Sequence, residues 1–104
     1  MTTWFISRHP GAIEWVKAQA LAVDRFVAHL DPAQVQAGDT VAGSLPVQLA
    51  AEICARGARY LHLSVDLPAE YRGRELSAQD LHRFNARLTP FIVTAAPDEA
   101  AERT

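Results

Sequence analysis

The fold begins with Trp4-Phe5-Ile6-Ser7-Arg8-His9-Pro10-Gly11, where an apolar run stops at three polar residues and a Pro-Gly pair. The β-branched and aromatic side chains of residues 3–6 favour a strand that is buried on both faces. Pro10-Gly11 then changes the direction of the backbone. Apolar residues recur at helical spacing through residues 12–22. Strand, tight turn and helix together predict the first half of a βαβ unit.

Ser7, Arg8 and His9 occupy the position where such a unit binds its ligand. The binding crevice of an α/β sheet lies beyond the carboxyl ends of the strands, where helix N-termini present unpaired N–H groups to anions. The Arg8 guanidinium suits a phosphate, and an imidazole such as His9 can move a proton near neutral pH. Two alternatives stay open, because Ser7 could instead cap the strand or the helix, and His9 could simply shape the turn.

The remaining elements follow the same alternation of strand and helix. The patterns predict a strand at 25–30, where a continued helix is the alternative, and then a short helix after the capping pair Asp31-Pro32. A strand at 39–42, a helix at 46–56 and a strand at 59–65 follow. The last two predicted elements are a helix capped by Ser77 and Asp80 that buries Leu81, Phe84 and Leu88, and a strand at 91–94. This order indicates a small α/β sandwich with a mostly parallel sheet of about five strands flanked by helices.

The length and the composition suggest a single small domain. We expect residues 1–96 to form it, and residues 97–104, which are small and polar, to form a flexible tail. A domain of this size leaves much of its surface exposed, which favours association with a second copy. Without a long apolar run or signal-peptide features, we expect the protein in the cytoplasm and away from membranes. Cys54 is the single cysteine, which excludes an internal disulfide and a thiolate cluster.

The charge balance argues against long nucleic acid as a partner. The net charge is −2, with 10 Lys and Arg residues against 12 Asp and Glu residues, so the chain has no overall basic field. Nine of the cations are arginines, and the planar guanidinium holds phosphate oxygens in pairs. A small phosphate-bearing ligand fits this composition better than a duplex.

Further candidate residues lie at other turns. Gly43 and Ser44 predict a backbone cradle for a ligand, or an ordinary turn into a helix. Arg72 and Arg74 lie on a loop that is long enough to cover a ligand, although a solvated charged loop fits equally well. His62 alternates with leucines in a strand and fits a packed histidine better than a catalytic one. The remaining histidines, His29 and His82, are expected at the surface.

Several segments resemble one protein family when they are taken together. They are Trp4-Phe5-Ile6-Ser7-Arg8-His9-Pro10-Gly11-Ala12, Gly38-Asp39-Thr40-Val41-Ala42-Gly43-Ser44-Leu45-Pro46 and Arg56-Gly57-Ala58-Arg59-Tyr60-Leu61-His62-Leu63, with Pro68 and Arg72-Gly73-Arg74-Glu75-Leu76 in register behind them. The chain thereby resembles the "Csx sixteen" family of small CRISPR-associated proteins that accompany type III systems. The resemblance extends over most of the chain.

The resemblance implies both a fold and an activity. The fold would be Rossmann-like and related to the sensor (CARF) domains that bind cyclic oligoadenylates, usually as a homodimer. The activity would be that of a ring nuclease, which linearises cyclic tetra-adenylate without a metal or another cofactor and so switches off type III antiviral signalling. A module that binds the ring without cutting it, as a sensor or sponge, and an accessory that docks on a larger effector complex are the alternatives.

The residues fit this chemistry. A cyclic oligoadenylate carries its own nucleophile, the ribose 2′-hydroxyl, so an enzyme can act mainly by orienting that group and stabilising the charged phosphorane. Arg8, His9 and Ser7 are the candidate catalytic residues, with His9 either accepting the proton of the 2′-hydroxyl or donating one to the leaving oxygen. The expected ligand-binding residues are Pro10, Gly11, Gly43, Ser44, Leu45, Arg72 and Arg74. A twofold-symmetric dimer could bind the ring on its own axis.

Overall fold

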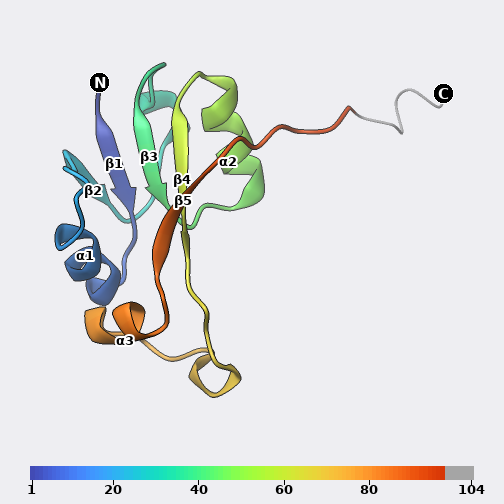
Figure 1. The fold of residues 1–104 in the computed structure, drawn as a ribbon. Coiled ribbons are helices and arrows are strands. Elements are labelled where there is room, and N and C mark those ends of the chain that lie inside the picture. Colours follow the sequence, from blue (N-terminus) through green and yellow to red (C-terminus); the bar gives the residue numbers. More distant parts are fainter. Residues whose placement is uncertain (98–104) are drawn as a thin grey trace.

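The computed structural model describes residues 1–97 and has a Rossmann-like α/β fold (Figure 1). Five strands form one sheet in the order β2-β1-β3-β4-β5, in which the first three neighbouring pairs are parallel and β5 is antiparallel to β4. The elements are β1 (Thr3–Ile6), α1 (Pro10–Lys17), β2 (Arg25–Val27), η1 (Pro32–Gln34), β3 (Thr40–Gly43), α2 (Val47–Ala55), β4 (Arg59–Ser64), η2 (Ala69–Tyr71), α3 (Ala78–Arg83) and β5 (Arg87–Phe91). The predicted fold class is confirmed. Of the predicted tail, residues 98–104 lie outside the described residues.

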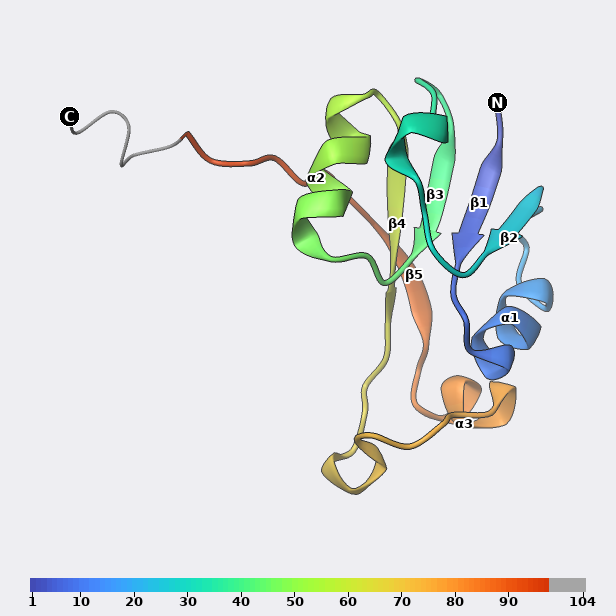
Figure 2. The same ribbon diagram turned by 180° about the vertical axis from the view of Figure 1, so that it is seen from behind.

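Helices cover both faces of the sheet, so each central strand is buried on two sides. Trp4 packs with Val41, Tyr60 and the α2 residue Ile53 on one face. Phe5 is fully buried on the other face, where it packs with residues of α1 and α3. The arrowheads of β1 and β3 point toward the end of the molecule where α3 lies, and the opposite view shows α2 alongside β4 (Figures 1 and 2). None of the helices within residues 1–97 is long and apolar enough to cross a membrane.

Two predicted elements near the N-terminus are too long. The helix predicted to reach residue 22 ends at Lys17, and the strand predicted at 25–30 ends at Val27. The helix must return the chain to the start of β1, because the Thr3 N–H donates to the Asp24 carboxylate at 2.8 Å and the Asp24 N–H donates to the Thr3 carbonyl at 2.8 Å. Eight helical residues rise about 12 Å and a four-residue strand about 13 Å, so the shorter helix matches the strand.

The C-terminal elements also differ from the prediction. Leu88 was expected on the third helix but lies on β5, because α3 ends at Arg83 and Asn85 adopts a φ of 58°. Leu81 and Leu88 pack on the same face of the sheet from two different elements, which produced an apparent helical spacing. The last strand begins at Arg87 and not at residue 91. It contains Pro90, which an edge strand tolerates because one side of its backbone needs no partner.

The starts of α1 and α3 touch through their backbones. The predicted capping box is confirmed, since Ser77 Oγ accepts from the Asp80 N–H and the Asp80 carboxylate accepts from the Ser77 N–H, both at 3.1 Å. A Cβ atom on Gly11 would lie 2.0 Å from the Leu76 carbonyl oxygen, so only glycine permits this approach. The contact brings residues 74–76 beside the turn that follows β1.

Asp39 is a buried charged residue that joins the chain start to β3. Its side chain is 4% exposed and accepts three hydrogen bonds, from the Thr2 N–H at 2.9 Å, the Gln36 N–H at 3.0 Å and the Trp4 Nε1–H at 3.3 Å. The two backbone N–H donors, followed by Trp4, hold the pKa of Asp39 below its usual range despite burial. Three donors therefore depend on one ionised carboxylate.

Replacing Asp39 by asparagine should destabilise the protein. Asp39→Asn keeps the shape but turns an NH₂ group toward at least one N–H donor, which costs about 1–3 kcal/mol. Chemical denaturation at pH 7, followed by the fluorescence of Trp4 and Trp15, measures the loss. Glu14→Gln, an exposed substitution on α1, is the control and should leave the unfolding free energy unchanged. Equal stability of Asp39→Asn and wild type would contradict this account of Asp39.

Acid should remove the advantage that Asp39 gives to the wild type. A carboxyl group with a lowered folded pKa stabilises the protein above its unfolded pKa of about 3.9 and loses that contribution as the pH falls through the folded pKa. The difference in unfolding free energy between wild type and Asp39→Asn should be full at pH 6 and shrink below about pH 3.9. Asp66, whose pKa is also lowered by Asn85 and Arg87, cancels in this comparison because both proteins carry it. A difference that stays constant from pH 6 to pH 2.5 would refute the assignment.

Candidate functional site

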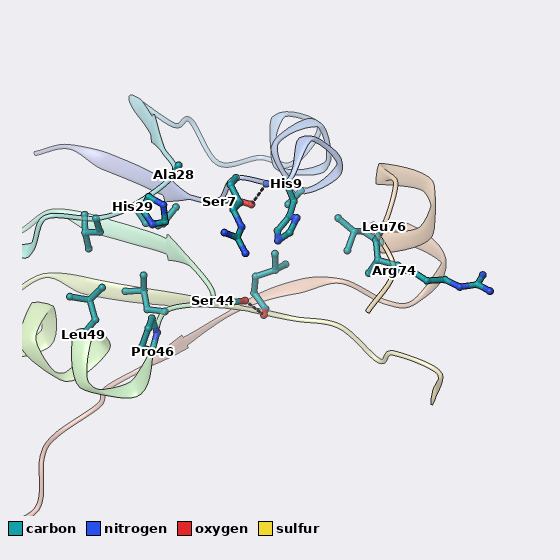
Figure 3. A pocket seen from close by; sticks show the side chains of 16 residues that line it. Ser7, His9, Ala28, His29, Ser44, Pro46, Leu49, Arg74 and Leu76 are labelled. Carbon is teal, nitrogen blue, oxygen red and sulfur yellow. Dashed lines mark hydrogen bonds between the residues drawn. The ribbon is translucent and has the colours of Figure 1, made fainter. Parts of the chain in front are cut away.

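A cleft of about 610 Å³ opens at the carboxyl ends of β1 and β3. The chain leaves β1 for α1 on one face and leaves β3 for α2 on the other, so the strand order reverses between these two strands. Ligands of open α/β sheets bind at such a switch point. The polar lining residues are Ser7, Arg8, His9, His29, Ser44 and Arg74, and the others are Ile6, Ala12, Ala28, Leu30, Leu45, Pro46, Leu49, Leu63, Leu76 and Leu81 (Figure 3).

The turn after β1 places His9 and a carboxylate together. The Ser7 Oγ accepts a hydrogen bond from the His9 N–H at 3.1 Å, and the Ser7 N–H donates to the Val27 carbonyl at 3.0 Å. His9 is the N-cap of α1, and its Nδ1 lies 3.0 Å from one Glu75 carboxylate oxygen and 3.2 Å from the other. With the proton of Nδ1 directed at Glu75, Nε2 is the nitrogen that can exchange a proton with a ligand.

Arg8 lies beside this pair and is exposed in the cleft. The ion pairs formed within residues 1–97 do not include Arg8, whereas Arg56, Arg83 and Arg87 each pair with a carboxylate. An arginine without a carboxylate partner keeps its donors available for an anion.

The turn after β3 forms the opposite wall. Gly43 has a φ of 143°, and a Cβ atom there would lie 2.6 Å from the Ile6 carbonyl oxygen, so the position requires glycine. Ser44 Oγ donates to the Leu63 carbonyl at 3.0 Å, and the Leu45 N–H donates to the Tyr60 hydroxyl at 3.0 Å. The turn is therefore tied to β4 on one side and fits closely against β1 on the other.

The structure brings together only some of the predicted site residues. Ser7, Arg8, His9, Ser44, Leu45 and Arg74 line the cleft, whereas Pro10, Gly11, Gly43 and Arg72 do not. Pro10 begins α1, Gly11 packs on Leu76 and Gly43 starts the second turn. The side chain of Arg74 points away from the cleft in Figure 3, and its guanidinium lies 5.2 Å from the centre of the Tyr71 ring.

The sequence did not predict that Glu75 contacts His9 or that His29 lines the cleft. Glu75 is separated from His9 by 66 positions in the chain, so no local pattern predicts their contact. His29 is exposed, as predicted, but it also lines the cleft, and it lies beyond β2, which ends at Val27 and not at residue 30. His62 lies on the same face of β4 as Tyr60, and its Nδ1 is 2.6 Å from the Tyr60 hydroxyl. Within residues 1–97, no cluster of three or more His, Cys, Asp or Glu residues could hold a metal ion.

Comparison with known proteins identifies the family. Neither a curated protein nor a solved structure matches the chain. A family model described as "Putative CRISPR-associated protein (Cas_VVA1548)" matches residues 4–94. This match begins at the second residue of β1 and ends beyond β5, so it covers all of the sheet except Thr3, together with both turns and the cleft. The chain therefore belongs to this family of CRISPR-associated proteins.

Proposed function

We propose that this protein is a ring nuclease of type III CRISPR systems, which binds cyclic tetra-adenylate and cuts it without a metal ion. The observation that supports this most directly is Arg8, which is exposed in the switch-point cleft without a carboxylate partner among residues 1–97 and lies beside the His9–Glu75 pair. The family match and the resemblance both indicate a CRISPR-associated protein, and the resemblance to the "Csx sixteen" family suggests the substrate.

The cleft suits a phosphate because Arg8 and the N-termini of two helices lie at it. The N-termini of α1 and α2 follow β1 and β3 directly, so both helix dipoles direct their positive ends toward the carboxyl edge of the sheet. Neither helix has an acidic residue in its first turn. The Glu75 carboxylate lies against His9 and partly offsets this field. Arg8 supplies the full positive charge.

The apolar residues that line the cleft suit a nucleobase. Leu30, Leu45 and Leu49 provide aliphatic surface there, and Pro46 and His29 add flat faces on which a purine can stack. A nucleotide would then lie with its base toward α2 and its phosphate toward Arg8.

The proposed reaction needs no water. The ribose 2′-oxygen attacks the adjacent phosphorus, the bond from phosphorus to the 5′-oxygen breaks, and a 2′,3′-cyclic phosphate and a 5′-hydroxyl result. The 2′-hydroxyl loses one proton and the 5′-oxygen gains one, so the reaction consumes and releases no net proton. His9 can perform either transfer through Nε2, while Arg8 stabilises the charge that builds up on the phosphorane oxygens.

The proposal includes a homodimer. A cyclic tetranucleotide has a twofold axis, and two copies of the Ser7-Arg8-His9 turn facing each other would contact opposite phosphates. Sedimentation of the purified protein with and without cyclic tetra-adenylate measures its oligomeric state directly.

A binding module that holds the ring intact is the second candidate function. The side chains of His9 and Glu75 are about 55% and 61% exposed, so water competes with the proposed proton transfer.

Removing the side chain of Arg8 or His9 should slow cleavage strongly. The purified protein is incubated with cyclic tetra-adenylate in excess chelator, and the products are separated by chromatography. Wild type should give linear products that end in a 2′,3′-cyclic phosphate. Arg8→Ala should lower the rate about 100-fold or more through lost transition-state charge stabilisation, and His9→Ala about 100-fold through lost proton transfer.

Arg56→Ala and His82→Ala are the matched controls. Both residues are exposed and neither lines the cleft, so their variants should keep wild-type rates. Ring that stays intact but bound to wild type would establish the binding module instead. A wild type that neither binds nor cuts the ring would reject both functions.

A further inference from the structure

Tyr60 is a buried polar residue that the proposed reaction does not use. It lies on β4, its side chain is 3% exposed, and it packs in the core that α2 covers. Its hydroxyl contacts three groups: the Leu45 N–H at 3.0 Å, the Gly43 carbonyl oxygen at 3.2 Å and the His62 Nδ1 at 2.6 Å. Two of these groups flank Ser44 in the turn that forms one wall of the cleft.

A single arrangement of protons satisfies all of these partners. A phenolic hydroxyl has one proton to donate and lone pairs that accept. The Leu45 N–H is a fixed donor and the Gly43 carbonyl a fixed acceptor, so the hydroxyl accepts from Leu45 and donates to Gly43. His62 then donates from Nδ1 to the hydroxyl oxygen. Burial raises the pKa of Tyr60 above its ordinary value, which keeps the proton on the hydroxyl.

Two other contacts hold the Gly43–Leu45 turn in place. Gly43 fits against the Ile6 carbonyl oxygen on the β1 side, and Ser44 Oγ donates to the Leu63 carbonyl. Between these contacts, the Tyr60 hydroxyl fixes the backbone on both sides of Ser44 and thereby the direction in which residues 44–46 face the cleft.

We propose that Tyr60 is a positioning residue for the ligand, acting through its hydroxyl on the Gly43–Leu45 turn, with His62 orienting that hydroxyl. The effect on cyclic tetra-adenylate rests on the proposed function. The effect on the turn does not rest on it, because the turn has this structure in the protein without ligand.

Tyr60→Phe tests the proposal, since it removes the hydroxyl and keeps the ring. In the ligand-free protein, hydrogen exchange of the Leu45 amide, measured by NMR, should accelerate about tenfold on loss of one hydrogen bond. The dissociation constant for cyclic tetra-adenylate, measured by calorimetry in chelator, should rise about tenfold for the same reason.

Ile53→Val is the matched control, because Ile53 is fully buried in the same core and its truncation costs stability while the hydrogen bonds of the Tyr60 hydroxyl stay in place. It should change neither the Leu45 exchange rate nor the dissociation constant. An unchanged Leu45 exchange rate in Tyr60→Phe, or equal effects in both variants, would overturn the proposal. If wild type does not bind the ring, the proposed function fails, while the exchange rates still decide whether Tyr60 holds the turn.

Discussion

The parallel pairing of β1 with β3 is the constraint on which the rest of the structure depends. These strands meet at the centre of the sheet, and their connections leave on opposite faces. The two following turns must therefore diverge, which opens a cleft at the carboxyl edge. At this edge the two strands lie so close together that a side chain at Gly43 would clash with the Ile6 carbonyl oxygen. The position of the cleft therefore follows from the sheet topology and not from particular side chains.

Buried polar groups hold the two ends of this central pair. Asp39 collects three N–H donors at the amino end of β3, and the Tyr60 hydroxyl connects to both sides of the turn at the carboxyl end. A buried polar group is costly unless its hydrogen bonds are made, so each one permits few backbone arrangements. Apolar packing stabilises the sheet, and these two groups determine how its ends are arranged.

The arginines within the described residues 1–97 have different surroundings. Arg56, Arg83 and Arg87 pair with carboxylates, and Arg25 stacks over the Trp4 ring at 4.6 Å. Arg8 lies in the cleft, next to a histidine whose orientation a carboxylate holds. Composition favoured a small phosphate-bearing ligand over a duplex, and the position of Arg8 in the cleft suggests where such a ligand would bind.

The sequence by itself determined the α/β class, the order of the elements and the position of the turn that carries Ser7, Arg8 and His9. These follow from apolar periodicity, capping residues and the Pro10-Gly11 pair, which act over a few neighbouring residues. Only the tertiary structure decided where the elements end, which strand lies antiparallel at the edge, and that Glu75 meets His9 from a distant loop. The physical reason is that such contacts depend on matched lengths of helix and strand and on packing between segments far apart in the chain, which no local pattern encodes.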